Sequence, residues 1–157
     1  MTPRSNSHGV IFIKGVRSKV DKLIATLVRR YKTNCPFALA EGLNINIRFA
    51  DLGEHTRGIY YCKLRRRFIV INSRLNSFWQ RFICAHELGH DRLHRGFNRF
   101  FLDEQSLQNT NKYERQANTF AVNLLLANSE VIPGETIGQL FMKAGIPYEM
   151  TQYYNGV

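Results

Sequence analysis

The chain has 157 residues, of which 44% are hydrophobic and 22% are charged. This length supports one domain with a packed core and leaves little room for a second, and the composition excludes a largely disordered chain. The net charge of +10 favours anionic partners such as DNA or an acidic protein, without choosing between them.

The sequence also predicts where the protein resides. The longest near-apolar stretch, residues 120–127, is far shorter than the roughly 20 residues that cross a bilayer, so we expect no membrane-spanning helix. The apolar run at residues 10–13 is too short for a signal-peptide core. Three cysteines without a CxxC pair fit free thiols in a reducing compartment. We therefore expect a cytoplasmic protein.

The first half of the chain predicts two helices and a small sheet. Apolar residues recur at three- and four-residue spacing from Val16 to Tyr31, which indicates a helix, and a short second helix is expected at residues 37–42. Strand patterns follow at residues 45–49, 58–63 and 68–72. The last two, joined by a basic turn at residues 64–67, predict an antiparallel hairpin. We expect a small antiparallel sheet of about three strands.

Helices dominate the second half. Ser77 and Gln80 have capping-box spacing and predict the start of a helix that runs past His90 and ends near Gly96. The elements expected next are an irregular stretch at residues 97–110, a long helix at 112–127, a final helix at 135–144 and a short segment at 147–154. The order of elements predicts an α+β fold.

His86 and His90 carry the strongest chemical signal. Four residues apart on a helix, their imidazoles lie about 40° apart around the axis and roughly 6 Å apart along it, so both can bind one metal ion. Glu87 follows the first histidine, where its carboxylate can take a proton from a water that the metal activates. This HExxH pattern predicts a zinc peptidase with Glu87 as the catalytic base. Chance would produce it in roughly one sequence in a hundred.

A catalytic zinc usually takes three protein ligands and a water, so a third ligand is needed. His94 continues the four-residue ladder but lies about 6 Å beyond His90 on a continuous helix, which favours a role beside the site or as a helix cap. Glu114, at the start of the next long helix, is the stronger candidate. Its spacing from Asn111 also fits a capping box, and the residues alone leave both interpretations open.

Two segments together resemble the ImmA/IrrE-type metallopeptidases, which are encoded largely in bacteria, phages and integrated mobile elements: Ala85-His86-Glu87-Leu88-Gly89-His90 and Glu114-Arg115-Gln116-Ala117-Asn118-Thr119-Phe120-Ala121. The resemblance implies His86, His90 and Glu114 as zinc ligands, Glu87 as the base, and a helical zincin-like (gluzincin-like) domain with its sheet packed on the motif helix. It also implies an anti-repressor protease, which cleaves the repressor protein of a phage or mobile element.

Three further residues are candidates for supporting roles. Asn118, one turn after Glu114, is expected to hydrogen-bond a liganding histidine. Tyr60 and Tyr61, on the strand before the motif, are candidates for the donor that stabilises the transition state, although core packing is the commoner role of such tyrosines. The exposed edge of the hairpin can instead accept an extended substrate.

Two other functions are carried as alternatives, a DNA-binding regulator and a non-catalytic zinc-binding protein. A helix-turn-helix-like trace spans residues 137–153, but residues 147–154 contain no Lys or Arg, which disfavours DNA binding as the primary function. The intact Glu87 argues against a non-catalytic protein. We expect a flexible tail (residues 1–9), a metallopeptidase domain (10–132) and a C-terminal helical appendage (133–157) within the same compact unit.

Overall fold

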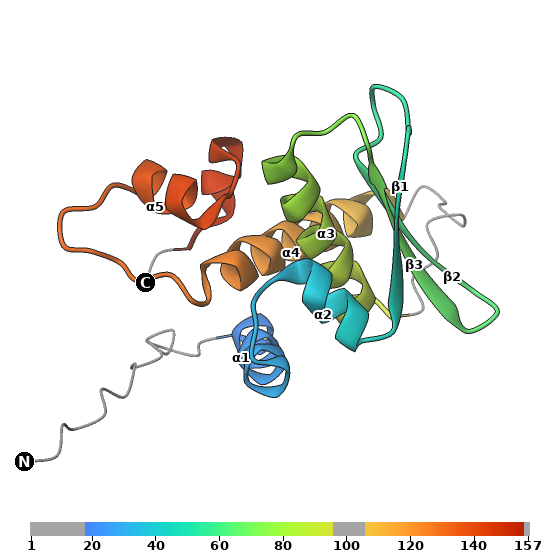
Figure 1. Cartoon of the computed structure of the whole chain (residues 1–157), viewed down its shortest axis with the longest axis horizontal. Coiled ribbons are helices and arrows are strands. Elements are labelled where there is room, and N and C mark those ends of the chain that lie inside the picture. Colours follow the sequence, from blue (N-terminus) through green and yellow to red (C-terminus); the bar gives the residue numbers. More distant parts are fainter. Residues whose placement is uncertain (1–17, 96–105, 156–157) are drawn as a thin grey trace, which may run out of the picture.

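The computed structural model describes residues 18–95 and 106–155 and confirms an α+β fold (Figure 1). The sheet lies at one end of the molecule and the last two elements at the other, with two long helices between them. The elements are α1 (Lys19–Tyr31), α2 (Pro36–Gly42), β1 (Ile45–Ala50), β2 (Gly58–Lys63), β3 (Arg66–Asn72), α3 (Ser77–Leu93), α4 (Ser106–Leu126), α5 (Ile137–Ala144) and the 3-10 helix η1 (Tyr148–Tyr153).

Several expectations concern residues outside this range, namely the tail, the first two residues of the predicted first helix, the helix end at Gly96 and most of the predicted irregular stretch. Within the range, α1 begins at Lys19 because Ser18 caps it: the Ser18 hydroxyl oxygen accepts from the backbone of Asp21, whose carboxylate accepts from the backbone of Ser18. None of the described helices is both long and apolar enough to cross a membrane.

The sheet has the order β1-β3-β2, which corrects one prediction. The β2–β3 hairpin is antiparallel as expected, but β1 pairs with β3 in parallel, so the sheet is mixed. Strand directions alternate along the chain, yet β3 lies between β1 and β2, so β1 pairs with β3 and not with β2. The buried side chain of Asn72, at the end of β3, donates to the carbonyls of Gly53 and Thr56 at 2.7 and 2.8 Å. It thereby holds the loop that crosses from β1 to β2.

Two helix starts also differ from expectation. Asn76, not Ser77, caps α3: its side chain accepts from the backbone of Trp79, while Gln80 donates to the Leu75 carbonyl. The neighbouring residues have the same capping chemistry, so spacing alone misplaced the cap by one position. The helix α4 begins at Ser106, within the stretch predicted to be irregular, so Asn111 lies inside the helix and is not its cap.

The C-terminal elements complete the core. Asn34, between α1 and α2, donates to the carbonyls of Leu124 and Leu125 and so satisfies the end of α4. Thr136 caps α5, whose buried Phe141 belongs to the main hydrophobic cluster. The segment after α5 is a short 3-10 helix, so the helix-turn-helix-like trace contains no second α-helix of the kind that enters a DNA groove.

The helices α3 and α4 make a close contact at Gly89. A Cβ atom at this position would lie 3.1 Å from Ala117 Cα and 3.2 Å from the ring of Phe120. These distances are too short for an ordinary contact, and the first of them is to backbone, which cannot rotate away. The two helices therefore approach each other as closely as they do because residue 89 has no side chain.

We predict that Gly89→Ala destabilises the protein. Overpacking a tight contact typically costs about 1–3 kcal/mol, which exceeds the gain of about 1 kcal/mol in helix propensity. Gly138→Ala is a matched control, because its Cβ would make its one tight contact, at 3.3 Å, with the ring of Tyr148, which is 69% exposed and free to shift. Urea unfolding of both variants would measure the difference, and a Gly89→Ala protein at least as stable as wild type would contradict the packing described here.

Candidate metal centre

Three side chains from two helices converge on one point. His86 and His90 project from α3, and their Nε2 atoms lie 3.1 Å apart. Glu114 projects from α4 and places Oε2 at 3.2 Å from His86 Nε2 and Oε1 at 3.2 Å from His90 Nε2. The structure thus brings together the three residues expected to form the metal site, and excludes the alternative in which Glu114 belongs to a capping box.

The spacing of these atoms fits a metal ion. Two ligand atoms that each lie about 2.0–2.1 Å from a tetrahedral zinc are separated by roughly 3.3 Å. This is close to the distance between the two Nε2 atoms and to the distance of each Nε2 from one of the two Glu114 oxygens. The histidine side chains are 9% and 8% exposed, whereas the side chain of Glu114 is 36% exposed. The cluster is therefore buried on the side of α3 and reaches solvent on the side of Glu114. Two imidazoles and a carboxylate are a zincin-type donor set.

A second layer of side chains contacts the ring nitrogens that face away from the cluster. Asn118 Oδ1 lies 2.8 Å from His86 Nδ1, so the contact expected for Asn118 is present. His94 ends α3 and places Nδ1 at 3.0 Å from His90 Nδ1, and its Nε2 lies 2.9 Å from Gln116 Oε1. The position of His94 agrees with the expectation of a residue beside the site that also caps the helix.

The pKa values of His86 and His94 are shifted in opposite directions. Burial alone would lower the pKa of His86, but the hydrogen bond to Glu114 and the charges of Glu87 and Glu114 outweigh it and raise the pKa above its ordinary value. Burial lowers the pKa of His94, against the opposing effect of its hydrogen bond to Gln116 Oε1. His94 is therefore a neutral imidazole near pH 7, with one nitrogen that donates and one that accepts.

The side chain of Glu87 extends from α3 toward the start of β2. The residue is 2% exposed, and a Cβ atom at Gly58 would lie 3.2 Å from its Oε1 and 2.3 Å from Ile83 Cγ2. Within the part of the chain that the structure describes, Glu87 Oε2 has no hydrogen-bond partner. A buried carboxylate oxygen without a partner is costly, and it is an arrangement often associated with function.

The two tyrosines of β2 point to opposite faces of the sheet. The Tyr60 hydroxyl donates to Asp91 at 2.8 Å, and burial together with this hydrogen bond raises the pKa of Tyr60, which keeps the hydroxyl protonated. Tyr61 stacks on Phe68 on the face away from α3, with ring centroids 4.9 Å apart. Neither contact brings a tyrosine to the metal cluster, and the role of transition-state donor stays a prediction.

Sequence reasoning missed Asp91. It follows His90 directly and is 1% exposed, with its carboxylate bound by Tyr60 and Arg67. The available signal was its position four residues after Glu87, which places both carboxylates on one face of the predicted helix.

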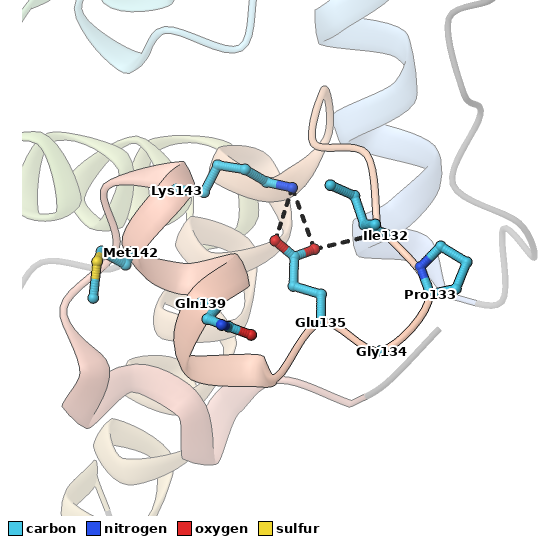
Figure 2. Close-up of a pocket in the computed structure, with 7 residues that line it drawn as sticks. All are labelled: Ile132, Pro133, Gly134, Glu135, Gln139, Met142 and Lys143. Atoms are coloured by element: carbon cyan, nitrogen blue, oxygen red, sulfur yellow. Dashed lines mark hydrogen bonds and ion pairs between the residues drawn. The ribbon is translucent and has the colours of Figure 1, made fainter.

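A hollow of about 510 Å³ lies elsewhere, beside α5 (Figure 2). Within it, Lys143 Nζ lies 2.9 Å from Glu135 Oε1. Its lining residues are Ile132, Pro133, Gly134, Glu135, Gln139, Met142 and Lys143. None of them belongs to the metal cluster, so the hollow is separate from the candidate site.

Comparison with known proteins agrees with this geometry. Residues 40–135 match the family described as the IrrE N-terminal-like domain, a peptidase family. The chain is 37% identical over 141 residues to immunity region protein 2 of Bacillus phage phi105, covering 87% of this chain and 89% of that protein. It is 31% identical over 147 residues to the metallopeptidase ImmA of Bacillus subtilis (strain 168), covering 89% and 83%. The chain belongs to the ImmA/IrrE family of metallopeptidases.

Membership confirms the resemblance read from the two motif segments. The matched region of this ImmA/IrrE metallopeptidase includes α3 and α4 and ends just before α5. It therefore contains all three residues of the cluster together with Glu87, Asp91 and Asn118.

We predict that the metal-free protein becomes less stable as pH rises above neutrality. Folded His86 binds its proton more tightly than unfolded histidine, whose pKa is about 6.5. The resulting stability is fully present below about pH 6.5 and is lost as pH rises through the raised pKa of the folded state. Thermal unfolding in chelator across this range measures the slope. In Glu114→Gln, which lacks the carboxylate, the decline should disappear; an unchanged slope would assign it to another group.

Proposed function

We propose that this metallopeptidase is a zinc-dependent endopeptidase that acts in the cytoplasm on one specific protein, the repressor of a phage or mobile element. The observation that carries the catalytic part is the convergence of His86, His90 and Glu114 beside the buried Glu87. The proposed catalytic unit is residues 10–132, with residues 133–157 as an appendage of the same compact unit.

His86, His90 and Glu114 would hold the zinc, and the contacts around them support the required protonation states. A histidine that coordinates through Nε2 carries its proton on Nδ1. His86 then donates from Nδ1 to Asn118 Oδ1. His90 donates from Nδ1 to His94 Nδ1, and His94 donates from Nε2 to Gln116 Oε1. Donors and acceptors match along both of these hydrogen-bond series. His86 and His90 therefore each present the lone pair of Nε2 to the proposed metal position.

Glu87 is the proposed base. When bound, zinc supplies Lewis acidity, which makes a water acidic enough to yield a nucleophile near neutral pH and polarises a carbonyl. Glu87 Oε2, which has no partner among the described residues, accepts the proton from the attacking water and then delivers it to the leaving amine. Burial of Glu87 keeps bulk water from competing for that oxygen.

The protein substrate is inferred from a relative. Immunity region protein 2 of the phage is similar to this chain over most of both lengths, and a peptidase related to it would act on the immunity system of such an element. The repressor is the protein whose cleavage would release the element. A basic chain of net charge +10 is also suited to capture an acidic segment of a protein partner.

Glu87→Gln tests the base directly. We expect cleavage of the repressor to fall by about 10²–10⁴-fold, the usual contribution of a general acid–base group, while zinc binding is retained. Co-expression with the repressor of the encoding element, followed by mass spectrometry of its fragments, measures cleavage. Repressor fragments produced at the wild-type rate by Glu87→Gln would refute the mechanism.

Glu114→Ala tests the third ligand in the same assay. We expect it to lose both zinc and cleavage, which separates its role from that of Glu87. Full zinc occupancy in this variant would remove Glu114 from the ligand set. Zinc binding with no cleavage by the wild-type protein would favour the non-catalytic alternative.

Asn118→Ala should lower zinc affinity by about 10–100-fold, because groups that orient liganding histidines contribute that much. Asn123→Ala is the matched control. It lies on the same helix and donates to Asp21 at 3.0 Å, so its loss affects the contact with α1 and leaves the cluster intact. Competition with a chromogenic chelator measures both affinities. Equal losses in the two variants would show a general effect of helix stability.

A further inference from the structure

A group of polar side chains around the buried Asp91 joins α3 to the sheet beside the proposed ligands. The carboxylate of Asp91 accepts from the Tyr60 hydroxyl at 2.8 Å and from Arg67 Nη1 at 3.1 Å to each oxygen. A second terminal nitrogen of Arg67 donates to the Leu43 carbonyl, at the end of α2. Arg92 Nε also donates to Asp91, at 2.5 Å. We call Asp91, Tyr60 and Arg67 the Asp91 cluster.

Stability alone gives little reason for such a cluster. The desolvation cost of a buried ion pair commonly offsets its Coulombic attraction, and apolar replacements of similar shape are often as stable. The contribution of the Asp91 cluster is geometric. It fixes one residue of α3 to one residue of each strand of the hairpin.

That fixed point is in step with Glu87. Asp91 follows Glu87 by four residues on the same face of α3, a rise of about 6 Å. Tyr60 follows Gly58 by two residues on the same face of β2, an advance of about 7 Å. The pairs Glu87–Gly58 and Asp91–Tyr60 therefore lie side by side, and β2 runs along α3 in the same direction. The hydrogen bond between Tyr60 and Asp91 therefore also keeps Gly58 next to Glu87.

At Gly58, β2 packs closely against α3. A Cβ there would lie 2.3 Å from Ile83 Cγ2 and 3.2 Å from Glu87 Oε1, so β2 can lie this close to the carboxylate only because residue 58 has no side chain. A small displacement of β2 would allow Glu87 to rotate. Its Oε2, which has no partner among the described residues, has no other hydrogen bond to restore its direction.

We propose that Asp91 is a positioning residue for peptide hydrolysis: through Tyr60 and Arg67 it holds the start of β2 against α3 and so fixes the Glu87 carboxylate. This inference rests on the proposed function and adds to it a residue that contacts neither the proposed metal ligands nor a substrate. Because the three proposed ligands belong to the α3–α4 contact, the Asp91 cluster should affect the base without affecting zinc affinity.

Tyr60→Phe tests this proposal with the loss of one hydroxyl. In the metal-free protein, hydrogen exchange of β2 amides should become at least about tenfold faster. Zinc affinity should stay at the wild-type value. With zinc, kcat should fall roughly ten- to hundredfold at unchanged KM, on the fluorogenic peptide that the wild-type protein cleaves fastest in a random library. Tyr154→Phe, a half-buried tyrosine packed on Phe141, is the control and should change none of the three.

Asp91→Asn separates positioning from direct catalysis by Tyr60. The amide in this variant would still accept from Tyr60 but would lack the charge that binds Arg67, so kcat should fall. In the double variant, with both Tyr60→Phe and Asp91→Asn, the fold-loss of kcat should be smaller than the product of the two single fold-losses. If kcat falls in Tyr60→Phe alone, Tyr60 acts on the substrate itself and the proposal is overturned. Wild-type kcat or wild-type exchange in Tyr60→Phe overturns it as well. Wild-type protein with zinc that cleaves neither a library peptide nor the co-expressed repressor refutes the proposed function, while the exchange experiment still tests whether the Asp91 cluster holds β2.

Discussion

The separation of α3 and α4 at Gly89 is the constraint on which the candidate metal centre depends. His86 and His90 are brought together by the geometry of a single helix, but Glu114 reaches them only if a second helix lies close enough. Small residues at a helix crossing permit the short end of the usual range of about 8–10 Å between axes. Gly89 and Ala117 provide this crossing one turn or less from each member of the cluster. Packing of an apolar core thus determines the distances among three polar groups.

The helix α3 packs against different neighbours on two faces about 100° apart. His86, Gly89 and His90 face α4, and the second face, with Glu87 and Asp91, is directed at the sheet. The proposed ligands and the proposed base are therefore held by different neighbours. A change in the sheet would therefore act on the proposed base, and a change in α4 would act on the proposed ligands.

Features that depend on local spacing could be predicted from the sequence. The two histidines and Glu87 fell on one helix because four-residue spacing is a property of the helix itself, and the β2–β3 hairpin followed from a short turn between two strand patterns. Features set by distant contacts could not. Nothing near Ile45 indicates that β3 would insert beside β1, since that order depends on the loop held by Asn72. The start of α4 was placed too late because Asn111 and Glu114 imitate a cap. Asp91 was missed because its partners Tyr60 and Arg67 lie 31 and 24 residues earlier in the chain, and no sequence pattern indicates which strand residues meet it.

Exposure within the candidate site is graded, and the gradient has a chemical consequence. Glu87 is almost fully buried and the two histidines nearly so, while Glu114 is the most exposed member of the group. Among these four side chains, solvent therefore reaches the candidate site chiefly on the side of Glu114. At the buried end, the surroundings of Glu87 have a low effective dielectric, where the interaction of its charge with His86 is stronger than in water. The same burial makes the orientation of Glu87 dependent on the protein groups around it, Ile83 and the start of β2 at Gly58, because the side chain is closed off from solvent.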